Sequence, residues 1–164
     1  MRIYEGRPRQ DYEEVLRSLG GFIDQRGMGS VLILEAPDGF VVQGLALISD
    51  PQQVAAGRRD KETYTFLDED IARFIEESRL RRGTQLDGAP AVAGPYERAL
   101  RVLGGYIDQQ QPRDAFLMEQ EGSWLLRLLM GARTGMQHVL VEFTPDEIAM
   151  RAQHAPALRT ANGP

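Results

Sequence analysis

Two heptads, LGGFIDQ at residues 19–25 and LGGYIDQ at residues 103–109, differ at one position and place a glycine pair inside an otherwise helical pattern. They lie 84 residues apart (103 minus 19), and the same spacing pairs Tyr12 with Tyr96 and Phe40 with Trp124. Further along, Ile71 matches Ile148 at a spacing of 77 (148 minus 71), which indicates a shorter loop in the second copy. A repeat of this length predicts two copies of one structural unit.

Each copy carries the same series of local patterns. Apolar residues recur at helical spacing over 12–23 and 96–107. The β-rich runs 30–35 and 40–48 flank the turn signal APDG and predict a hairpin, and third strands follow at 63–67 and 138–143. A helix comes after each third strand, and the second of these helices begins with a capping box from Thr144 to Glu147.

These patterns predict an α+β fold of two tandem α-β-β-β-α repeats with antiparallel sheets, packed as an intramolecular pseudo-twofold dimer. The first repeat would span residues 1–86 and the second residues 87–164, with a flexible joint at 83–94 and a loose tail beyond Pro156.

The glycine pairs predict a close approach between the two first helices. A glycine inside a helix costs about 1 kcal/mol relative to alanine, so four of them indicate a compensating contact. Gly20 falls at the edge of the apolar face and Gly21 nearly opposite to it, at 100° per residue. We therefore expect the repeat interface at Gly20, Gly21, Gly104 and Gly105, the alternative being a kink or two short helices.

The strands carry apolar residues at consecutive positions, as in VLIL at 31–34 and WLLRLLM at 124–130. Such runs predict that both faces of the sheet are covered, either by helices on each side or by elements of the other copy. Gln43 and Arg127 interrupt the runs at equivalent positions. They are interpreted either as pointing into a shared cavity or as occupying an edge or strand end.

Composition excludes several classes of function. A net charge of -5 argues against a sequence-independent nucleic-acid binder, and the absence of cysteine excludes thiolate chemistry. No apolar run approaches the roughly 18 to 20 residues of a membrane span, which predicts a cytoplasmic protein without membrane contact. His138 and His154 lack a metal-ligand spacing, and no nucleophile elbow or phosphate loop is present, so we expect no cofactor.

The repeat duplicates two carboxylates, pairing Asp24 with Asp108 and Glu35 with Glu119. If they converge on a twofold axis, they are candidate ligands of Mg²⁺ or Ca²⁺ or an acid–base pair. The alternative is a solvated glutamate at a strand end and an aspartate that accepts local hydrogen bonds. A basic cluster, Arg58, Arg59 and Lys61, is interpreted as a solvated loop or as a dock for an acidic partner.

The α-β-β-β-α order is similar to that of double-stranded RNA-binding domains, but the final helices begin with Asp68-Glu69-Asp70 and Asp146-Glu147 in place of phosphate-gripping lysines. In charge and topology the chain resembles bacterial secretion-chaperone folds. The sequence predicts a non-catalytic cytoplasmic binding or interaction module, chaperone-like or regulatory, with a protein partner or self-association. The alternatives are a metal-assisted hydrolase that uses the duplicated carboxylates and a structural subunit of a homo-oligomer.

Overall fold

The computed structural model describes residues 3–4, 7–8, 11–47, 52, 59–84, 94–132 and 135–162. The helices within these residues are α1 (Tyr12–Arg26), α3 (Asp68–Thr84), α4 (Pro95–Gln110) and α5 (Pro145–Asn162). The main strands are β3 (Gly29–Ala36), β4 (Gly39–Leu47), β5 (Arg59–Leu67), β6 (Asp114–Gln120), β7 (Ser123–Ala132) and β8 (Gly135–Phe143). A short ladder joins β1 (Ile3–Tyr4) to β2 (Arg7–Pro8).

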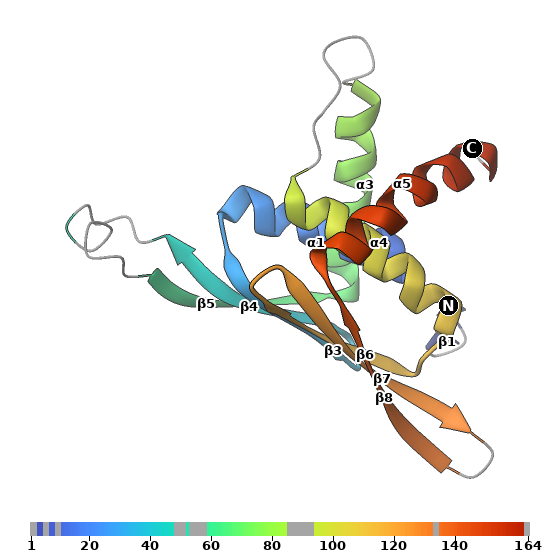
Figure 1. Ribbon diagram of the computed structural model, residues 1–164. Coiled ribbons are helices and arrows are strands. Elements are labelled where there is room, and N and C mark those ends of the chain that lie inside the picture. Colours follow the sequence, from blue (N-terminus) through green and yellow to red (C-terminus); the bar gives the residue numbers. More distant parts are fainter. Residues whose placement is uncertain are drawn as a thin grey trace.

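One six-stranded antiparallel sheet runs through the molecule in the order β5-β4-β3-β6-β7-β8 (Figure 1). The prediction of an α+β fold with antiparallel pairing is therefore confirmed. The pairing of β3 with β6 closes the middle of the sheet and matches Leu32 with Met118 and Leu34 with Phe116. The expected boundary at residues 86 and 87 lies outside the described residues.

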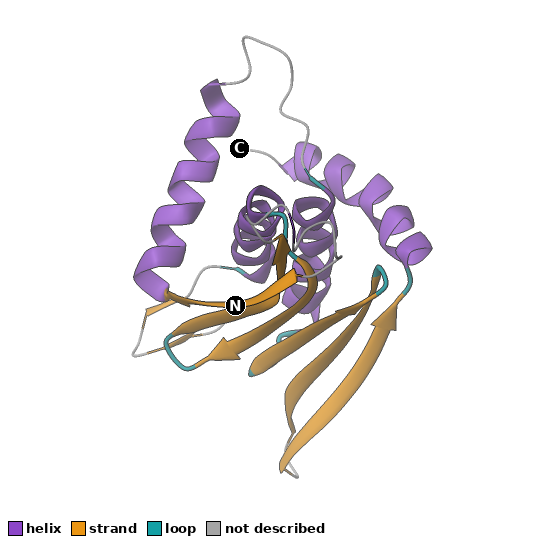
Figure 2. Ribbon diagram, turned by 90° about the vertical axis from the view of Figure 1, so that its left-hand side faces the viewer, coloured by secondary structure: helices purple, strands orange, loops and turns teal. Residues whose placement is uncertain are grey.

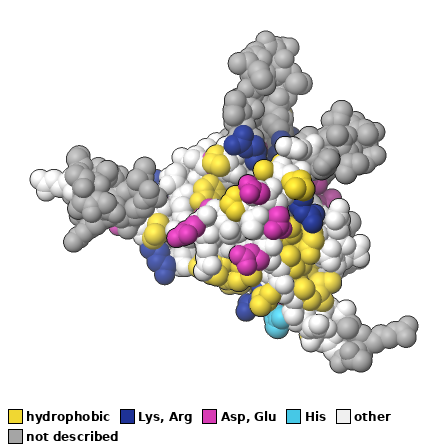
Figure 3. Space-filling view, viewed as in Figure 1, with side chains coloured by type: hydrophobic (Ala, Val, Ile, Leu, Met, Phe, Trp, Pro, Cys, Tyr) yellow, Lys and Arg dark blue, Asp and Glu magenta, His cyan; other side chains and the backbone are white. Residues whose placement is uncertain are grey.

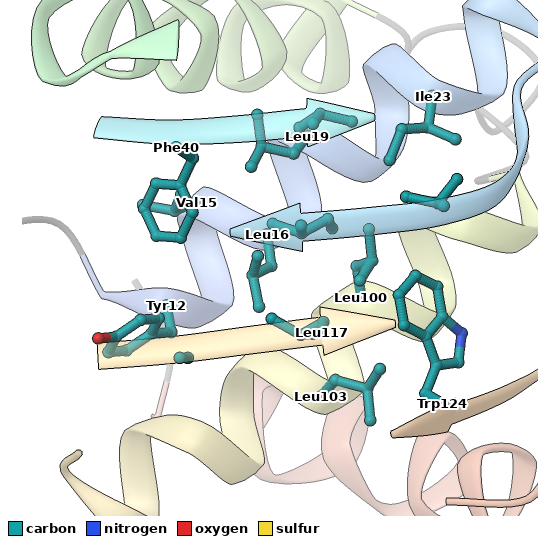
Figure 4. Close-up of a cluster of buried hydrophobic side chains, with 14 of the residues drawn as sticks. Tyr12, Val15, Leu16, Leu19, Ile23, Phe40, Leu100, Leu103, Leu117 and Trp124 are labelled. Atoms are coloured by element: carbon teal, nitrogen blue, oxygen red, sulfur yellow. The ribbon is translucent and has the colours of Figure 1, made fainter. Parts of the chain in front are cut away.

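All four helices lie on one face of the sheet, with α1 and α4 over its middle and α3 and α5 towards its two ends (Figure 2). The core fills the space between α1, α4 and the strands beneath them (Figure 4). Leu16 and Leu103 are completely buried there, and Trp124 closes one side. The helical spacing of the apolar residues places them on the sides of α1 and α4 that face the sheet.

Aromatic contacts attach the two outer helices. On one side Phe22 of α1 packs edge-on against Phe66 of β5 and Phe74 of α3. On the other side Tyr106 of α4 packs edge-on against Phe143 of β8, and the Arg151 guanidinium of α5 lies over both rings. These contacts hold the outer helices over the same face as α1 and α4.

The opposite face of the sheet is not covered by any of the described helices, so the prediction that both faces are covered is wrong. Burial alternates along β3, where Val31, Ile33 and Glu35 are buried while Leu34 is 44% exposed. Because successive side chains of a strand point to opposite faces, the consecutive apolar run supplies both a core face and an apolar face in contact with solvent.

Two further predictions differ from the structure. The helix α5 continues past Pro156 to Asn162, where the sequence predicts a loose tail. The basic cluster does not form a loop, because Arg59 and Lys61 belong to β5, while Arg58 lies outside the described residues. Within the described part of the chain, no helix combines the length and apolar character that crossing a membrane requires.

Candidate functional site

The two first helices meet at Gly20 and Gly104. A methyl group added at Gly20 would lie 2.6 Å from the carbonyl oxygen of Tyr96 and 2.7 Å from Cα of Glu97. A methyl group at Gly104 would lie 2.6 Å from both the carbonyl oxygen of Tyr12 and Cα of Glu13. Only glycine allows backbones to approach so closely.

Gly21 and Gly105 do not share this contact, although the sequence groups them with the interface. A methyl group at Gly21 would have no neighbour within 4 Å, and one at Gly105 would reach only the Glu13 carboxylate, at 3.9 Å. The helices lie side by side in one layer above the sheet, so the sides that face each other are the edges of the two apolar stripes, where Gly20 lies. Each helix also continues through its glycine pair and is not divided into two short helices.

Asp24 of α1 caps the N-terminus of α4, and Asp108 of α4 caps the N-terminus of α1. The Asp24 carboxylate accepts hydrogen bonds from the backbone N–H groups of Tyr96 and Glu97, both at 3.0 Å. The Asp108 carboxylate accepts the equivalent bonds from Tyr12, at 2.8 Å, and Glu13, at 3.1 Å. These amides open α4 and α1 and have no partner within their own helix. A carboxylate at a helix N-terminus also interacts favourably with the helix dipole.

Local residues do not provide these caps. The residues before the helices, Asp11 and Gly94, make no side-chain cap bond. A methyl group on Gly94 would collide with the Asp24 carboxylate, which occupies the space where a local cap would lie. Burial raises the pKa of Asp108, and the two backbone donors oppose that rise without cancelling it. The carboxylate is thus partly withdrawn from water and accepts hydrogen bonds from two backbone amides.

Glu35 of β3 and Glu119 of β6 link the two halves of the sheet, β5-β4-β3 and β6-β7-β8. Glu35, 9% exposed, accepts hydrogen bonds from the Tyr12 hydroxyl at 2.7 Å and the Ala115 N–H at 3.0 Å. Glu119 accepts from the Tyr96 hydroxyl at 2.6 Å and the Val31 N–H at 3.3 Å. The N–H groups of Ala115 and Val31 lie just beyond the two ends of the short β3–β6 ladder. The two carboxylates therefore accept hydrogen bonds from backbone groups that have no partner within that ladder.

The duplicated carboxylates do not converge on one site. Asp108 binds the start of α1 and Asp24 lies 12 residues later on that helix (24 minus 12), which separates the two carboxylates by roughly 18 Å. Among the described side chains, no group of three or more His, Asp or Glu could hold a metal ion. Each duplicated acid instead accepts hydrogen bonds from backbone amides of the other half of the chain. The two glutamates also accept a tyrosine hydroxyl of their own half.

Gln43 and Arg127 lie on the uncovered face of the sheet and do not share a cavity. They belong to β4 and β7, with β3 and β6 between them. The Gln43 amide nitrogen donates to the Thr63 hydroxyl at 3.1 Å, and the Arg127 guanidinium lies 5.1 Å from the centre of the Phe116 ring.

Between these two residues lies a continuous apolar surface, which we call the open face patch. Its six members come from the four middle strands and are at least partly exposed: Leu32, Leu34, Val41, Phe116, Met118 and Leu125. The strand register arranges these side chains in two rows that run across the strands. One row is Gln43, Leu32, Met118 and Leu125, and the other is Val41, Leu34, Phe116 and Arg127. The polar residues therefore mark opposite corners of the patch.

Charges of both signs surround this patch. The charged side chains that the structure describes on this face are three cations and two anions: Lys61, Arg127 and Arg113, which lies beside the backbone of Gly131, and Asp114 and Glu142. The whole chain, in contrast, carries a net charge of -5. Figure 3, which views the molecule as in Figure 1, shows several acidic side chains in magenta on the middle of the visible surface.

The open face patch is not among the sites predicted from the sequence, although the sequence carries a signal for it. Leu32 and Leu34 occupy alternate positions of β3, and the same spacing in the second copy gives Phe116 and Met118. Consecutive apolar residues are typical of a strand with both faces buried, because a sheet with one face in solvent usually carries polar residues on that face.

Comparisons with protein-family models, with curated proteins and with solved structures find no match to this chain.

Proposed function

We propose that this protein is a non-catalytic interaction module that binds another polypeptide through the open face patch. The observation that carries the proposal is an apolar surface over four adjacent strands with no described helix above it. Contiguous exposed apolar surface of this kind marks interaction sites in soluble proteins. Burying it gains about 25 cal/mol per Å² of apolar surface removed from water.

We further propose that the molecule is an internal pseudo-dimer of two α-β-β-β-α units. The paired contacts support this, because the Gly20, Asp24 and Glu35 contacts all recur 84 residues later, at Gly104, Asp108 and Glu119. The patch follows the same rule, since its first three members match its last three at that spacing. A partner would accordingly meet two copies of one apolar motif, turned towards each other across the β3–β6 boundary.

The alternative of a metal-assisted hydrolase receives less support. The four carboxylates that would carry it bind backbone amides and tyrosine hydroxyls, and Asp24 and Asp108 lie at opposite ends of the helix pair. These structural roles explain why the sequence duplicates them.

Site-specific photo-crosslinking tests the proposed function. A photoreactive phenylalanine analogue replaces Leu34, at the centre of the patch, in the full chain expressed in its own cells. The matched control carries the analogue at Met150 of α5, an apolar residue that is 62% exposed but lies outside the patch. We expect a discrete crosslinked product from position 34 and none from position 150, with the crosslinked polypeptide identified by mass spectrometry.

Equal crosslinking from the two positions, or none from position 34, would contradict the use of this face. Thermal unfolding of each variant, followed by circular dichroism, verifies beforehand that both substitutions leave the fold intact.

A further inference from the structure

We infer that the polypeptide bound by the open face patch is a second copy of this chain, so that two sheets pack face to face about a twofold axis. The inference rests on the proposed function, because it assigns the occupant of the same surface. Three features of the face favour a second copy: its size, its charges and its shape.

The size of the face suits a stable dimer. Adjacent strands lie about 4.8 Å apart and residues on one face recur every ~6.8 Å along a strand, so six strands and three rows of side chains give a flat footprint of roughly 600 Å². The accessible surface exceeds this flat value because side chains corrugate it. Specific interfaces bury about 800 Å² for each partner, so the face alone approaches what a homodimer needs.

The charges of the face permit contact with an identical copy. A chain with a net charge of -5 repels its own copies, and a contact through an acidic surface would add to that repulsion. The open face instead sets three cations, Lys61, Arg113 and Arg127, against the anions Asp114 and Glu142, so its described side chains do not share the acidic excess of the chain. Both signs lie at the margin of the patch, where two opposed copies can pair cations with anions around an apolar centre.

The shape of the face fits a sheet better than a helix or a single extended strand. The patch is two rows deep and four strands wide, with Leu32 and Met118 in one row and Leu34 and Phe116 in the other. A helix would cover only part of that width. Two such sheets stacked about 10 Å apart would interdigitate their apolar side chains as in a β-sandwich. An isologous contact also closes after two copies, which prevents continued growth.

Sedimentation velocity and light scattering of the full chain from about 1 to 200 μM test the inference. We expect a dimer of twice 18.4 kDa, and we expect Leu34→Glu to weaken the association at least ~100-fold, because each copy would bury a carboxylate without a partner. The control, Met150→Glu, places the same charge at an exposed apolar position of α5 and should leave the dimer unchanged. Leu140→Glu on β8, where leucine is 64% exposed, gives a second disrupting variant if Leu34→Glu does not fold.

Cysteine crosslinking gives an independent measurement, because the chain has no cysteine of its own. We expect a bis-maleimide with a spacer of ~10 Å to link two copies of Leu34→Cys efficiently and two copies of Met150→Cys poorly. A dimer that survives both glutamate variants of the open face would overturn the inference and would point to another contact surface.

The outcomes separate this inference from the proposed function. A chain that stays monomeric at 200 μM, while position 34 photo-crosslinks to a different protein, overturns the second copy as occupant and leaves the interaction module supported. A monomer without any crosslink from position 34 overturns both.

Discussion

Alanine at Gly20 and alanine at Gly21 should have opposite effects on stability, although the residues are adjacent on one helix. Both substitutions gain about 1 kcal/mol of helix propensity. At Gly20 the new methyl group would lie 2.6 Å from the Tyr96 carbonyl oxygen and 2.7 Å from Cα of Glu97. Both are backbone atoms, so α1 and α4 must move apart, and overpacking of this kind costs about 1–3 kcal/mol.

The separation of the helices should also weaken the two hydrogen bonds from the start of α4 to Asp24. At Gly21 no atom lies within 4 Å of the added methyl group, so the gain in propensity remains. Because that gain is common to both variants, the difference between them isolates the cost of the contact. We expect Gly20→Ala to be less stable than Gly21→Ala by about 1–3 kcal/mol.

Urea-induced unfolding at 25 °C, followed by circular dichroism, measures this difference as the shift in midpoint multiplied by a common m-value. Gly104→Ala and Gly105→Ala repeat the comparison on α4, where the first methyl group would meet the backbone of Tyr12 and Glu13 and the second only a carboxylate at 3.9 Å. Equal stability of the two variants within each pair would refute the argument that the helices depend on their close approach.

Three further substitutions test the remaining contacts. Asp108→Ala should lower the free energy of unfolding by about 1–2 kcal/mol, as the loss of a helix cap does, and urea unfolding measures it. Glu35→Leu should lower the free energy of unfolding by about 1–3 kcal/mol, because the Ala115 N–H loses its acceptor. Glu35→Gln keeps an acceptor oxygen and should lower it less. Equal losses in the two variants would argue against this hydrogen bond. The pKa of Glu62 is lowered, chiefly by the hydrogen bond from Arg26, so its stabilisation is present above the ordinary value of 4.5 and is lost as the pH falls through the lowered value. The melting temperature of Glu62→Gln should therefore lie below that of wild type at pH 7, and the difference should narrow as the pH falls through the lowered pKa of Glu62.

The sequence was sufficient to predict the local elements, because each has a strong short-range cause. The capping box is one example: the Glu147 N–H donates to the Thr144 hydroxyl at 3.2 Å, at the residue where α5 begins. Apolar residues at helical spacing likewise located α1 and α4. In these cases the partners lie within a few residues of each other, so their spacing alone carries the information.

The candidate site could not be predicted in the same way, because it depends on how the halves meet. The repeat identified Asp24 and Asp108 as special residues, but not that each reaches the N-terminus of the other helix. It identified a glycine pair, but which glycine makes the contact depends on whether the helices lie side by side or are stacked. The open face depends likewise on the described helices all lying on one side of the sheet.

The exchange of aspartates between α1 and α4 has a consequence for folding. Neither helix can complete its first turn with its own residues, because the bonds to Asp24 and Asp108 join residues between 72 and 96 positions apart. Loops of that length must close before either bond forms, which slows folding. The polypeptide should therefore unfold in a single cooperative transition, and a fragment that ends near residue 84 should remain largely unstructured when alone.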